Sequence, residues 1–240
     1  LVYSPWQTAS FYANWGRTFQ IGVGSGAYKL ASLQDDLKPS INEGWETGIK
    51  FNPVTWLDGR VAYWEQHATD EVQRRLNAPS GDTENVGETL RRGYDVQLNL
   101  YPNDLARVWF SYSRQFSEIL TPGPRLPASK GKEMDHVPHH LYALGGDYQA
   151  SEKLKLSAWV NGQSDYYLER TNSTGQYGGY TLLNLGAEYR LSESVSVDMQ
   201  LKNVTNRYYE YVWYDPDGAL DSLHAPGDGR ALYAGLTLDF

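Results

Sequence analysis

The connections between strand-like segments in this 240-residue chain alternate strictly between short and long. The segments themselves alternate apolar and polar residues with a period of two, which is the pattern of a β-strand with one apolar and one polar face. In the last segment, Leu232, Leu236 and Phe240 fall on one face, and Tyr233 and Thr237 fall on the other. No stretch shows a convincing helical period. The sequence therefore predicts an all-β fold.

Ten full strands are predicted, together with a shorter stub at 1–4. The alternation slips near Asn203–Val204, which predicts a β-bulge there. The strands lie near 8–19, 43–52, 58–72, 91–101, 105–116, 138–149, 153–167, 180–190, 195–209 and 230–240.

The short connections carry Pro, Asn and Ser, the residues of tight turns, whereas the long ones are rich in Gly, Pro, Asp and Tyr. The tight turns are Ser4–Trp6, Asn52–Val54, Tyr101–Asp104, Ala150–Glu152 and Ser192–Ser194. The long loops are 20–42, 73–90, 117–137, 168–179 and 210–229. Outer-membrane barrels have short periplasmic turns and long extracellular loops. The chain is therefore expected to form an antiparallel transmembrane β-barrel in a bacterial outer membrane, with a periplasmic C-terminus and extracellular long loops.

Composition agrees with this interpretation. The chain has 19 Tyr and 8 Trp against 6 Phe, and such residues form girdles at membrane interfaces. A Tyr-rich, soluble carbohydrate-binding β-protein is an alternative, although it gives no reason for the one-sided loops. The formal net charge of -8 and the lack of basic clusters argue against a nucleic-acid partner. Cysteine is absent, so neither disulfides nor thiolate metal sites are available.

Five stretches resemble motifs of the TonB-dependent outer-membrane receptor family. Each motif is weak alone, but the five occur in the order of the family and extend over about four fifths of the chain. They are Leu37–Ser40 with Trp45–Lys50, Arg92–Val96 (with Asp95 where the family usually has Glu), Val137–His140, Leu201–Tyr209 and Gly229–Phe240.

The resemblance implies a 22-stranded barrel whose lumen is filled by an N-terminal plug. Residues 1–240 would then be the C-terminal part of the barrel, with about ten of the strands, and the plug and N-terminal strands would be absent from this chain. The implied function is TonB-coupled import of a ferric siderophore or related metal chelate, without enzymatic activity or cofactor. Expected partners are that chelate, outer-membrane lipid and lipopolysaccharide, and TonB through the absent plug.

Polar-face charges of both signs are expected to line the lumen, where they would contact a plug or water. They are Glu46, Lys50, Asp95, Arg107, Lys155, Glu188, Arg190, Asp198 and Lys202.

Aromatic and guanidinium groups of the long loops are the candidate ligand-binding residues, because they can hold an anionic iron chelate by stacking and charge-assisted hydrogen bonds. We rank Tyr177, Trp213, Tyr214 and Arg170 first, since they lie in the last two long loops. The other loop candidates are Tyr28, Tyr180, Tyr211, Arg114 and Arg125.

The stretch 136–140 contains three histidines and follows two acidic residues. Imidazole and carboxylate groups suit Zn²⁺ or Cu²⁺. Because Pro138 marks a strand entry, we expect a solvated loop end there and no metal site.

A complete ten-stranded outer-membrane protease, resembling the omptins, is the enzymatic alternative. Its acid–base groups would be Asp135 with His136, or Asp221 with His224, positioned to activate water. Direct pairing between the first and last strands would favour this alternative, whereas two open edges would favour part of a receptor.

Overall fold

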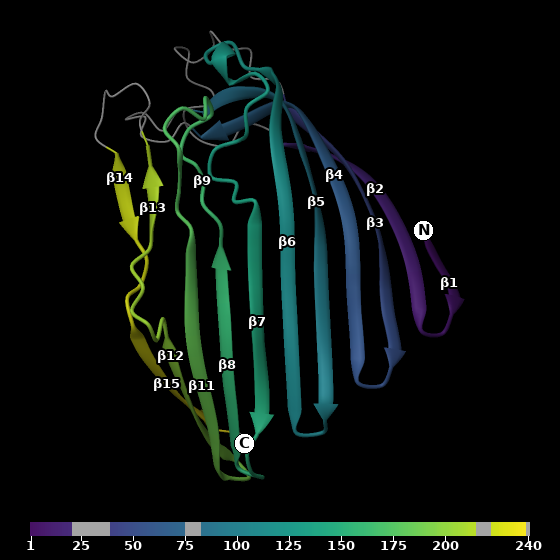
Figure 1. Cartoon of the computed structure of the whole chain (residues 1–240), viewed down its shortest axis with the longest axis vertical. Coiled ribbons are helices and arrows are strands. Elements are labelled where there is room, and N and C mark those ends of the chain that lie inside the picture. Colours follow the sequence, from purple (N-terminus) through teal and green to yellow (C-terminus); the bar gives the residue numbers. More distant parts are fainter. Residues whose placement is uncertain (21–38, 75–82, 215–221, 239–240) are drawn as a thin grey trace.

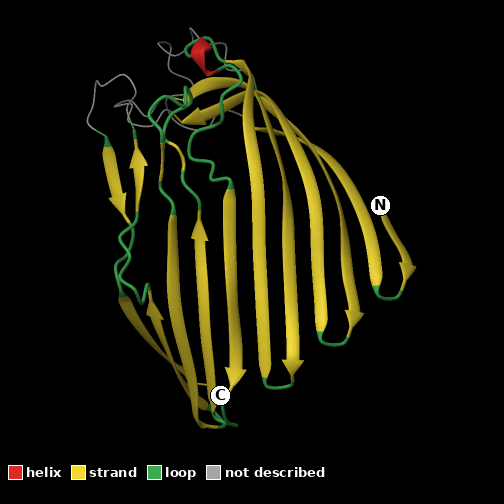
Figure 2. Ribbon diagram, in the orientation of Figure 1, coloured by secondary structure: helices red, strands yellow, loops and turns green. Residues whose placement is uncertain are grey.

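A computed structural model describes residues 1–20, 39–74, 83–214 and 222–238. Its main feature is one antiparallel sheet of eleven long or medium strands (Figures 1 and 2), in the order β1-β2-β3-β4-β5-β6-β7-β8-β11-β12-β15. The strands of this sheet are β1 (Val2–Trp6), β2 (Ala9–Gln20), β3 (Ser40–Val54), β4 (Leu57–Arg74), β5 (Thr83–Asn103), β6 (Ala106–Pro122), β7 (His140–Gln149), β8 (Leu154–Gln163), β11 (Tyr180–Ser192), β12 (Val195–Lys202) and β15 (Ala231–Leu238).

Smaller elements lie in the long connections, at the upper end of the sheet in Figure 1. They are the short pair β9 (Tyr166–Tyr167) with β10 (Gln176–Tyr177), the hairpin β13 (Glu210–Trp213) with β14 (Leu223–Pro226), and the 3-10 turn η2 (Pro127–Ser129). All tight turns lie at the opposite end, which we name the turn end; the other is the loop end. The predicted all-β fold and the one-sided distribution of loops are confirmed.

The period-two prediction is also confirmed, because partners in the ladder keep the same face from strand to strand. Phe110 pairs with Leu98 and with Leu144, and all three belong to the apolar face. Leu144 is 46 % exposed on this face. Large apolar side chains exposed in this way require an apolar surrounding medium or another protein surface to cover them.

Aromatic side chains line the apolar face at two levels. Near the loop end, Trp45 packs against Tyr63 with ring centroids 5.4 Å apart, and Tyr94 lies 6.1 Å from Tyr112. Near the turn end, Tyr148 is also exposed on the apolar face. Two aromatic levels with an aliphatic band between them are the arrangement of a transmembrane barrel wall.

The predicted turns at Ser4–Trp6 and Asn52–Val54 were placed about two residues too early. The strands continue through Pro5, Pro53 and Pro102, and the chain reverses just after them. Each proline falls where the pairing register breaks immediately before the turn. A proline cannot donate to the ladder, so it is tolerated at such an irregularity.

Several strand ends also differ from the prediction. β5 and β6 extend by up to eight residues into segments expected to be loops, whereas β12 ends at Lys202 and does not reach 209. The cause of the early end is Asn203, whose φ of 49° lies in the left-handed region. Asn tolerates this conformation, so the slipped alternation marks a turn and not a bulge.

Both outer strands of the sheet are open edges among the described residues. β1 pairs only with β2, and β15 pairs only with β12. The predicted stub at 1–4 is thus a strand of the sheet, which makes eleven strands and not ten. The sheet does not close on itself, so the complete ten-stranded protease barrel is excluded.

The largest fully buried apolar side chains, Ile119 and Met134, lie at the loop end. Val86, Ile119 and Met134 are 2 %, 0 % and 1 % exposed and pack together, with Val137 against them. They join β5 and β6 to the segment that follows η2, whose Gly131 N–H donates to the Ile119 carbonyl over 2.8 Å. Among the described residues, no helix is both long and apolar enough to cross a membrane.

Candidate functional site

The last three long connections fold onto one another, and we name their described parts the loop cap: residues 123–139, 164–179, 203–214 and 222–230. The first and second are joined by the Glu133 N–H, which donates to Asn172 Oδ1 over 2.8 Å, and by the His136 N–H, which donates to the Tyr167 carbonyl over 2.9 Å. The cap therefore sits over the loop ends of β7, β8, β11 and β12 (Figure 1).

His136 links the three long connections that form the cap. Its Nδ1 lies 2.9 Å from Asp135 Oδ2, and its Nε2 lies 2.8 Å from the Val212 carbonyl oxygen. Its ring stacks on Tyr211 at 4.7 Å, and Arg170 Nε lies 3.3 Å from the other Asp135 oxygen. The His136 side chain is only 9 % exposed. The expectation of a solvated loop end was wrong for this residue, because tertiary contacts enclose it.

The three imidazoles of 136–140 have separate partners. His139 Nε2 lies 2.5 Å from Glu133 Oε2, and His140 Nδ1 lies 2.7 Å from the Tyr112 hydroxyl. The Asp135–His136 pair has no free ring nitrogen to activate water, and Asp221, the other acid considered, lies outside the described residues. The arrangement offers packing and hydrogen bonding, not acid–base chemistry.

The four predicted ligand-binding residues all lie in the loop cap, but in two different environments. Arg170 is ion-paired with Asp135 inside the His136 cluster. Tyr177 is 41 % exposed, and its hydroxyl donates to Glu210 Oε1 over 2.8 Å. Trp213 meets Tyr211 edge-on at 5.0 Å, and Tyr214 follows it at the end of β13. Their binding of a ligand remains a prediction.

The other loop candidates are dispersed. The Tyr180 ring packs at a tilt against the Tyr209 ring, with centroids 4.7 Å apart, and Tyr211 belongs to the His136 cluster. Arg114 lies on the apolar face, over the Phe116 ring at 4.8 Å, so it does not join the cap. Tyr28 lies outside the described residues.

Glu210 is a second centre of the cap that the sequence analysis missed. Its Oε2 accepts the Tyr208 hydroxyl over 2.6 Å and lies 3.1 Å from His224 Nδ1, while its Oε1 accepts the Tyr177 hydroxyl. The hydrogen bonds from Tyr208 and then Tyr177 lower the pKa of Glu210. The same bonds raise the pKa of both phenols. The Glu210 carboxylate therefore contacts two phenols and one imidazole.

The residues around Glu210 come together because β13 and β14 form a hairpin. Tyr208 and Glu210 are two positions apart, and His224 is opposite Val212, two pairs further along the ladder from Glu210. Period-two spacing over 208–212 could have indicated a strand, but these residues were assigned to the end of a long strand and to a loop. Tyr177 arrives from β10, across the neighbouring connection.

A third carboxylate organises the connection before β10. Glu169 is 5 % exposed and accepts the backbone N–H of Thr171 over 2.5 Å and that of Thr174 over 3.2 Å, with Ser173 also donating to it. Burial raises its pKa, but these hydrogen bonds outweigh burial and hold the pKa of Glu169 below its usual value. A carboxylate that accepts several backbone N–H groups stabilises the loop conformation around it.

The polar face of the sheet carries the mixed charges that were expected there. Glu46 accepts from the Tyr12 hydroxyl over 2.5 Å and from Arg60 over 3.1 Å. Further along the face, Lys202 Nζ lies 4.5 Å from the Trp159 ring centroid. These groups pair with one another across strands, as they would on a wall that faces water or another polar surface.

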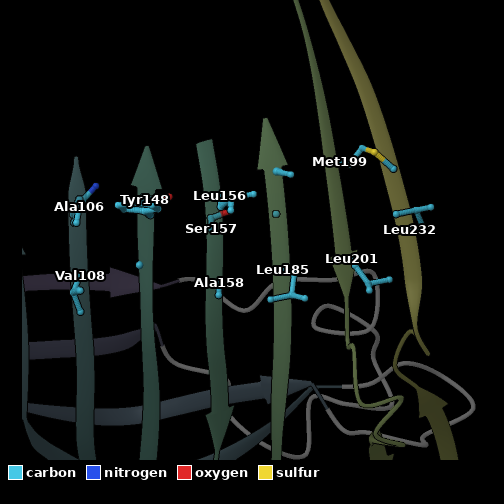
Figure 3. Close-up of a pocket in the computed structure, with 15 residues that line it drawn as sticks. Ala106, Val108, Tyr148, Leu156, Ser157, Ala158, Leu185, Met199, Leu201 and Leu232 are labelled. Carbon is cyan, nitrogen blue, oxygen red and sulfur yellow. The ribbon is translucent and has the colours of Figure 1, made fainter. Parts of the chain in front are cut away.

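A large depression lies on the apolar side of the sheet, away from the loop cap (Figure 3). Its volume is about 750 Å³, and it opens where Gly146 and Ala158 leave space beside Tyr148, Leu185 and Leu232. Its lining is nearly all apolar, so it suits hydrocarbon and not a charged chelate. The loop cap, with its convergent polar and aromatic groups, remains the candidate site.

Comparison with known proteins agrees with this architecture. The model of TonB-dependent receptor-like β-barrels matches residues 1–206. The chain belongs to the TonB-dependent receptor family. The predicted family and the antiparallel barrel fold are therefore confirmed, and the family is one of outer-membrane β-barrels. No curated protein sequence matches the chain.

Solved structures of TonB-dependent receptors share the fold at low identity. The siderophore receptor PiuA from Acinetobacter baumannii is 17 % identical with a TM-score of 0.75, over 98 % of this chain and 34 % of its own. The ferric yersiniabactin uptake receptor FyuA from Yersinia pestis is 15 % identical with a TM-score of 0.78, over 100 % and 36 %. The copper transporter OprC is 12 % identical with a TM-score of 0.74, over 100 % and 38 %.

The chain thus spans about a third of the length of these structures. The matched family and the similar structures are receptors and transporters, not enzymes. This finding agrees with the open sheet edges in rejecting the protease alternative.

Proposed function

We propose that the chain is part of an outer-membrane receptor that binds a ferric siderophore or a related metal chelate and imports it with energy from TonB. The long loops would be extracellular and the C-terminus periplasmic. Coupling would pass through a plug that fills the polar-lined lumen and is not part of this chain.

The observation that carries this proposal is the loop cap. It places aromatic side chains, among them the exposed Tyr177 and the half-buried Trp213 and Tyr214, around a polar cluster at the end of the sheet where ligand would enter. Aromatic faces and charge-assisted hydrogen bonds suit an anionic chelate. The names of similar structures include siderophore receptors and a copper transporter, which sets the range of chelates to test.

Arg170 has a different part in this proposal. Because it is paired with Asp135, releasing it toward a ligand would disconnect the His136 cluster. Arg170 would then bind ligand only together with a rearrangement of the cap.

The proposal is tested by uptake of radioactive iron in iron-starved cells whose only receptor is the protein that contains this chain. Catecholate, hydroxamate and citrate complexes would be compared with a copper chelate. Trp213→Ala and Tyr214→Ala should each weaken binding of the transported chelate about tenfold, because truncating a central aromatic residue at an interface costs roughly 1–2 kcal/mol or more. The matched control is Trp56→Ala, an exposed tryptophan at the turn end.

Uptake that persists in cells without TonB would overturn the coupling. Equal binding by both cap variants and by the control would remove the loop cap from the ligand site.

A further inference from the structure

Four potential metal ligands converge in the loop cap, and of these only Tyr177 is also a candidate contact for a chelate. They are the phenols of Tyr177 and Tyr208, the carboxylate of Glu210 and the imidazole of His224. Among the described residues, no three His, Asp or Glu side chains gather as a metal site. Any metal chemistry here therefore depends on the two phenols.

The distances from these groups to the Glu210 carboxylate are close to those between neighbouring ligands of one ion. Tyr208 Oη and His224 Nδ1 lie 2.6 and 3.1 Å from Glu210 Oε2, and Tyr177 Oη lies 2.8 Å from Oε1. In octahedral sites with metal–oxygen bonds of about 2.0–2.1 Å, neighbouring ligand atoms lie about 2.9 Å apart. An ion could therefore replace the hydrogen-bonding protons with only small movements of the side chains.

An ion can also reach these four side chains from solvent, and the backbone of the hairpin holds Glu210 in place. Tyr208 is 65 % exposed and His224 is exposed at the edge of the β13–β14 hairpin, so an ion can approach from solvent. Glu210 is held on the hairpin by backbone pairing with Pro226. The base of the site is thus fixed, while the outer ligands are free to adjust.

We propose that Tyr177, Tyr208, Glu210 and His224 form a binding site for a hard, highly charged transition-metal ion, with ferric iron as the favoured occupant. Displacing a phenol proton requires a strong Lewis acid, which disfavours Ca²⁺ and Mg²⁺. Carboxylate suits hard ions and imidazole suits iron, and tyrosinate is an established iron ligand. Binding releases the protons of the two phenols, so the affinity rises with pH.

This site differs in kind from the proposed recognition of a chelate, because the protein itself supplies the ligand atoms. It would accept an iron ion from a weak carrier with exchangeable ligands. The inference rests on the hairpin residues and not on transport, so uptake and ion binding can fail independently.

The test is titration of the purified protein, in detergent micelles, with ferric nitrilotriacetate at neutral pH. A bound phenolate gives a visible phenolate-to-iron charge-transfer band, which a chelate bound by stacking alone would not give. The expected result is a saturable band with one iron per protein. Tyr177→Phe and Tyr208→Phe should each weaken iron binding by at least about tenfold, the effect seen when even outer-shell groups of metal sites are removed.

Tyr209→Phe is the matched control. Tyr209 directly follows Tyr208, and its ring packs at a tilt against Tyr180; among the described contacts, its hydroxyl does not bind the Glu210 carboxylate. Each variant removes one hydroxyl oxygen from a tyrosine of the cap, and unchanged thermal unfolding would show that folding is intact. The control should keep the band at full intensity.

The absence of a saturable band would overturn the proposal, and so would a band of unchanged affinity in the Tyr177→Phe/Tyr208→Phe double variant. Either result would mean that these residues only hydrogen-bond two connections of the cap to each other and bind no ion. Uptake of a chelate without any band would retain the proposed receptor function and remove only this site.

Discussion

The strand wall and the loop cap place their side chains by different means. In the strand wall, by which we mean the eleven-stranded sheet, alternation along a strand decides which face a side chain occupies. Leu144 and its neighbour Ala143 face opposite sides because they are one residue apart. In the cap, the surroundings depend on contacts between distant segments, as when His136 meets the carbonyl of Val212, 76 positions away. The wall therefore tolerates substitutions that keep an apolar residue on the apolar face and a polar residue on the polar face. The cap depends instead on individual residues.

Burial shows the same contrast. Apolar side chains of the wall are exposed on its outer face, and the most buried ones, Ile119 and Met134, lie at the loop end. In the wall, the surrounding medium completes the packing, while the cap packs against itself. Substitutions should consequently be judged against lipid in the wall and against cavity formation in the cap.

The largest expected effect comes from placing a charge on the apolar face of the wall. Leu144 lies on the apolar face between Tyr142 and Tyr148, within the aliphatic band. Leu144→Arg should destabilise the protein in lipid by roughly 2–4 kcal/mol, the cost of Arg near the midplane of a barrel. Urea unfolding in lipid vesicles measures it.

Ala143→Arg is the control for that substitution, because Ala143 lies on the polar face between Ser111 and Asn161. It should cost much less. Equal losses in the two variants would show that the face assignment of β7 is wrong.

A cavity where β6 packs against the loop cap is expected to have the next largest effect. Ile119→Ala should cost about 2–3 kcal/mol, since large-to-small changes at fully buried positions lose both transfer energy and packing. The loss should be local, with faster hydrogen exchange in the cap and little change in the strands.

Ile49→Ala is the comparison in the wall. Ile49 belongs to the apolar face of β3, where lipid can fill the space left by the substitution. If both isoleucine variants lose the same stability, the distinction between lipid-completed wall and self-packed cap does not hold.

These differences explain what the sequence could predict. Period-two alternation and loop length indicated the sheet and its two faces, because both features are local in the sequence. The ends of β5 and β6 were missed since Ile119 is held by Lys132 and Gly131, residues outside the strand. Glu210 was missed because His224 reaches it across the β13–β14 hairpin and Tyr177 reaches it from another connection.

The candidate ligand residues illustrate the limit most clearly. Composition and position selected Tyr177 and Trp213 correctly as members of the cap. The ion pair of Arg170 with Asp135 depends on how two connections dock, and no spacing in the sequence indicates it. A residue type can suggest binding chemistry, but its availability is decided by tertiary contacts.

A smaller effect is expected from the turn that ends β12. Asn203 is 2 % exposed with φ of 49°, and its Nδ2 donates to the Arg207 carbonyl over 2.8 Å. Asn203→Ala should cost about 1–2 kcal/mol, because buried backbone groups lose their partner. Asn206→Ala is the control: Asn206 also has a positive φ, but it is exposed and should lose less in the same thermal unfolding measurement.

The smallest effect tests the electrostatics of the Glu210 cluster. The pKa of Glu210 is lowered by Tyr208 and Tyr177, so its contribution to the cap is present above the ordinary Glu pKa of about 4.3 and is lost as pH falls through the lower folded value. The pKa values of Tyr177 and Tyr208 are raised, first of all by the hydrogen bond to Glu210. Their contribution is complete below about pH 10 and is lost as pH rises through the folded values.

Glu210→Gln removes the charge while keeping a side chain of the same shape. NMR titration of ring-labelled tyrosines should then show the pKa values of Tyr177 and Tyr208 moving down toward the ordinary value. The pKa of Tyr211 is raised by burial and then by Asp135, so it should not move. A shift at all three tyrosines would mean that the substitution loosens the whole cap, and the Glu210 cluster would then be a general support and not a local electrostatic unit.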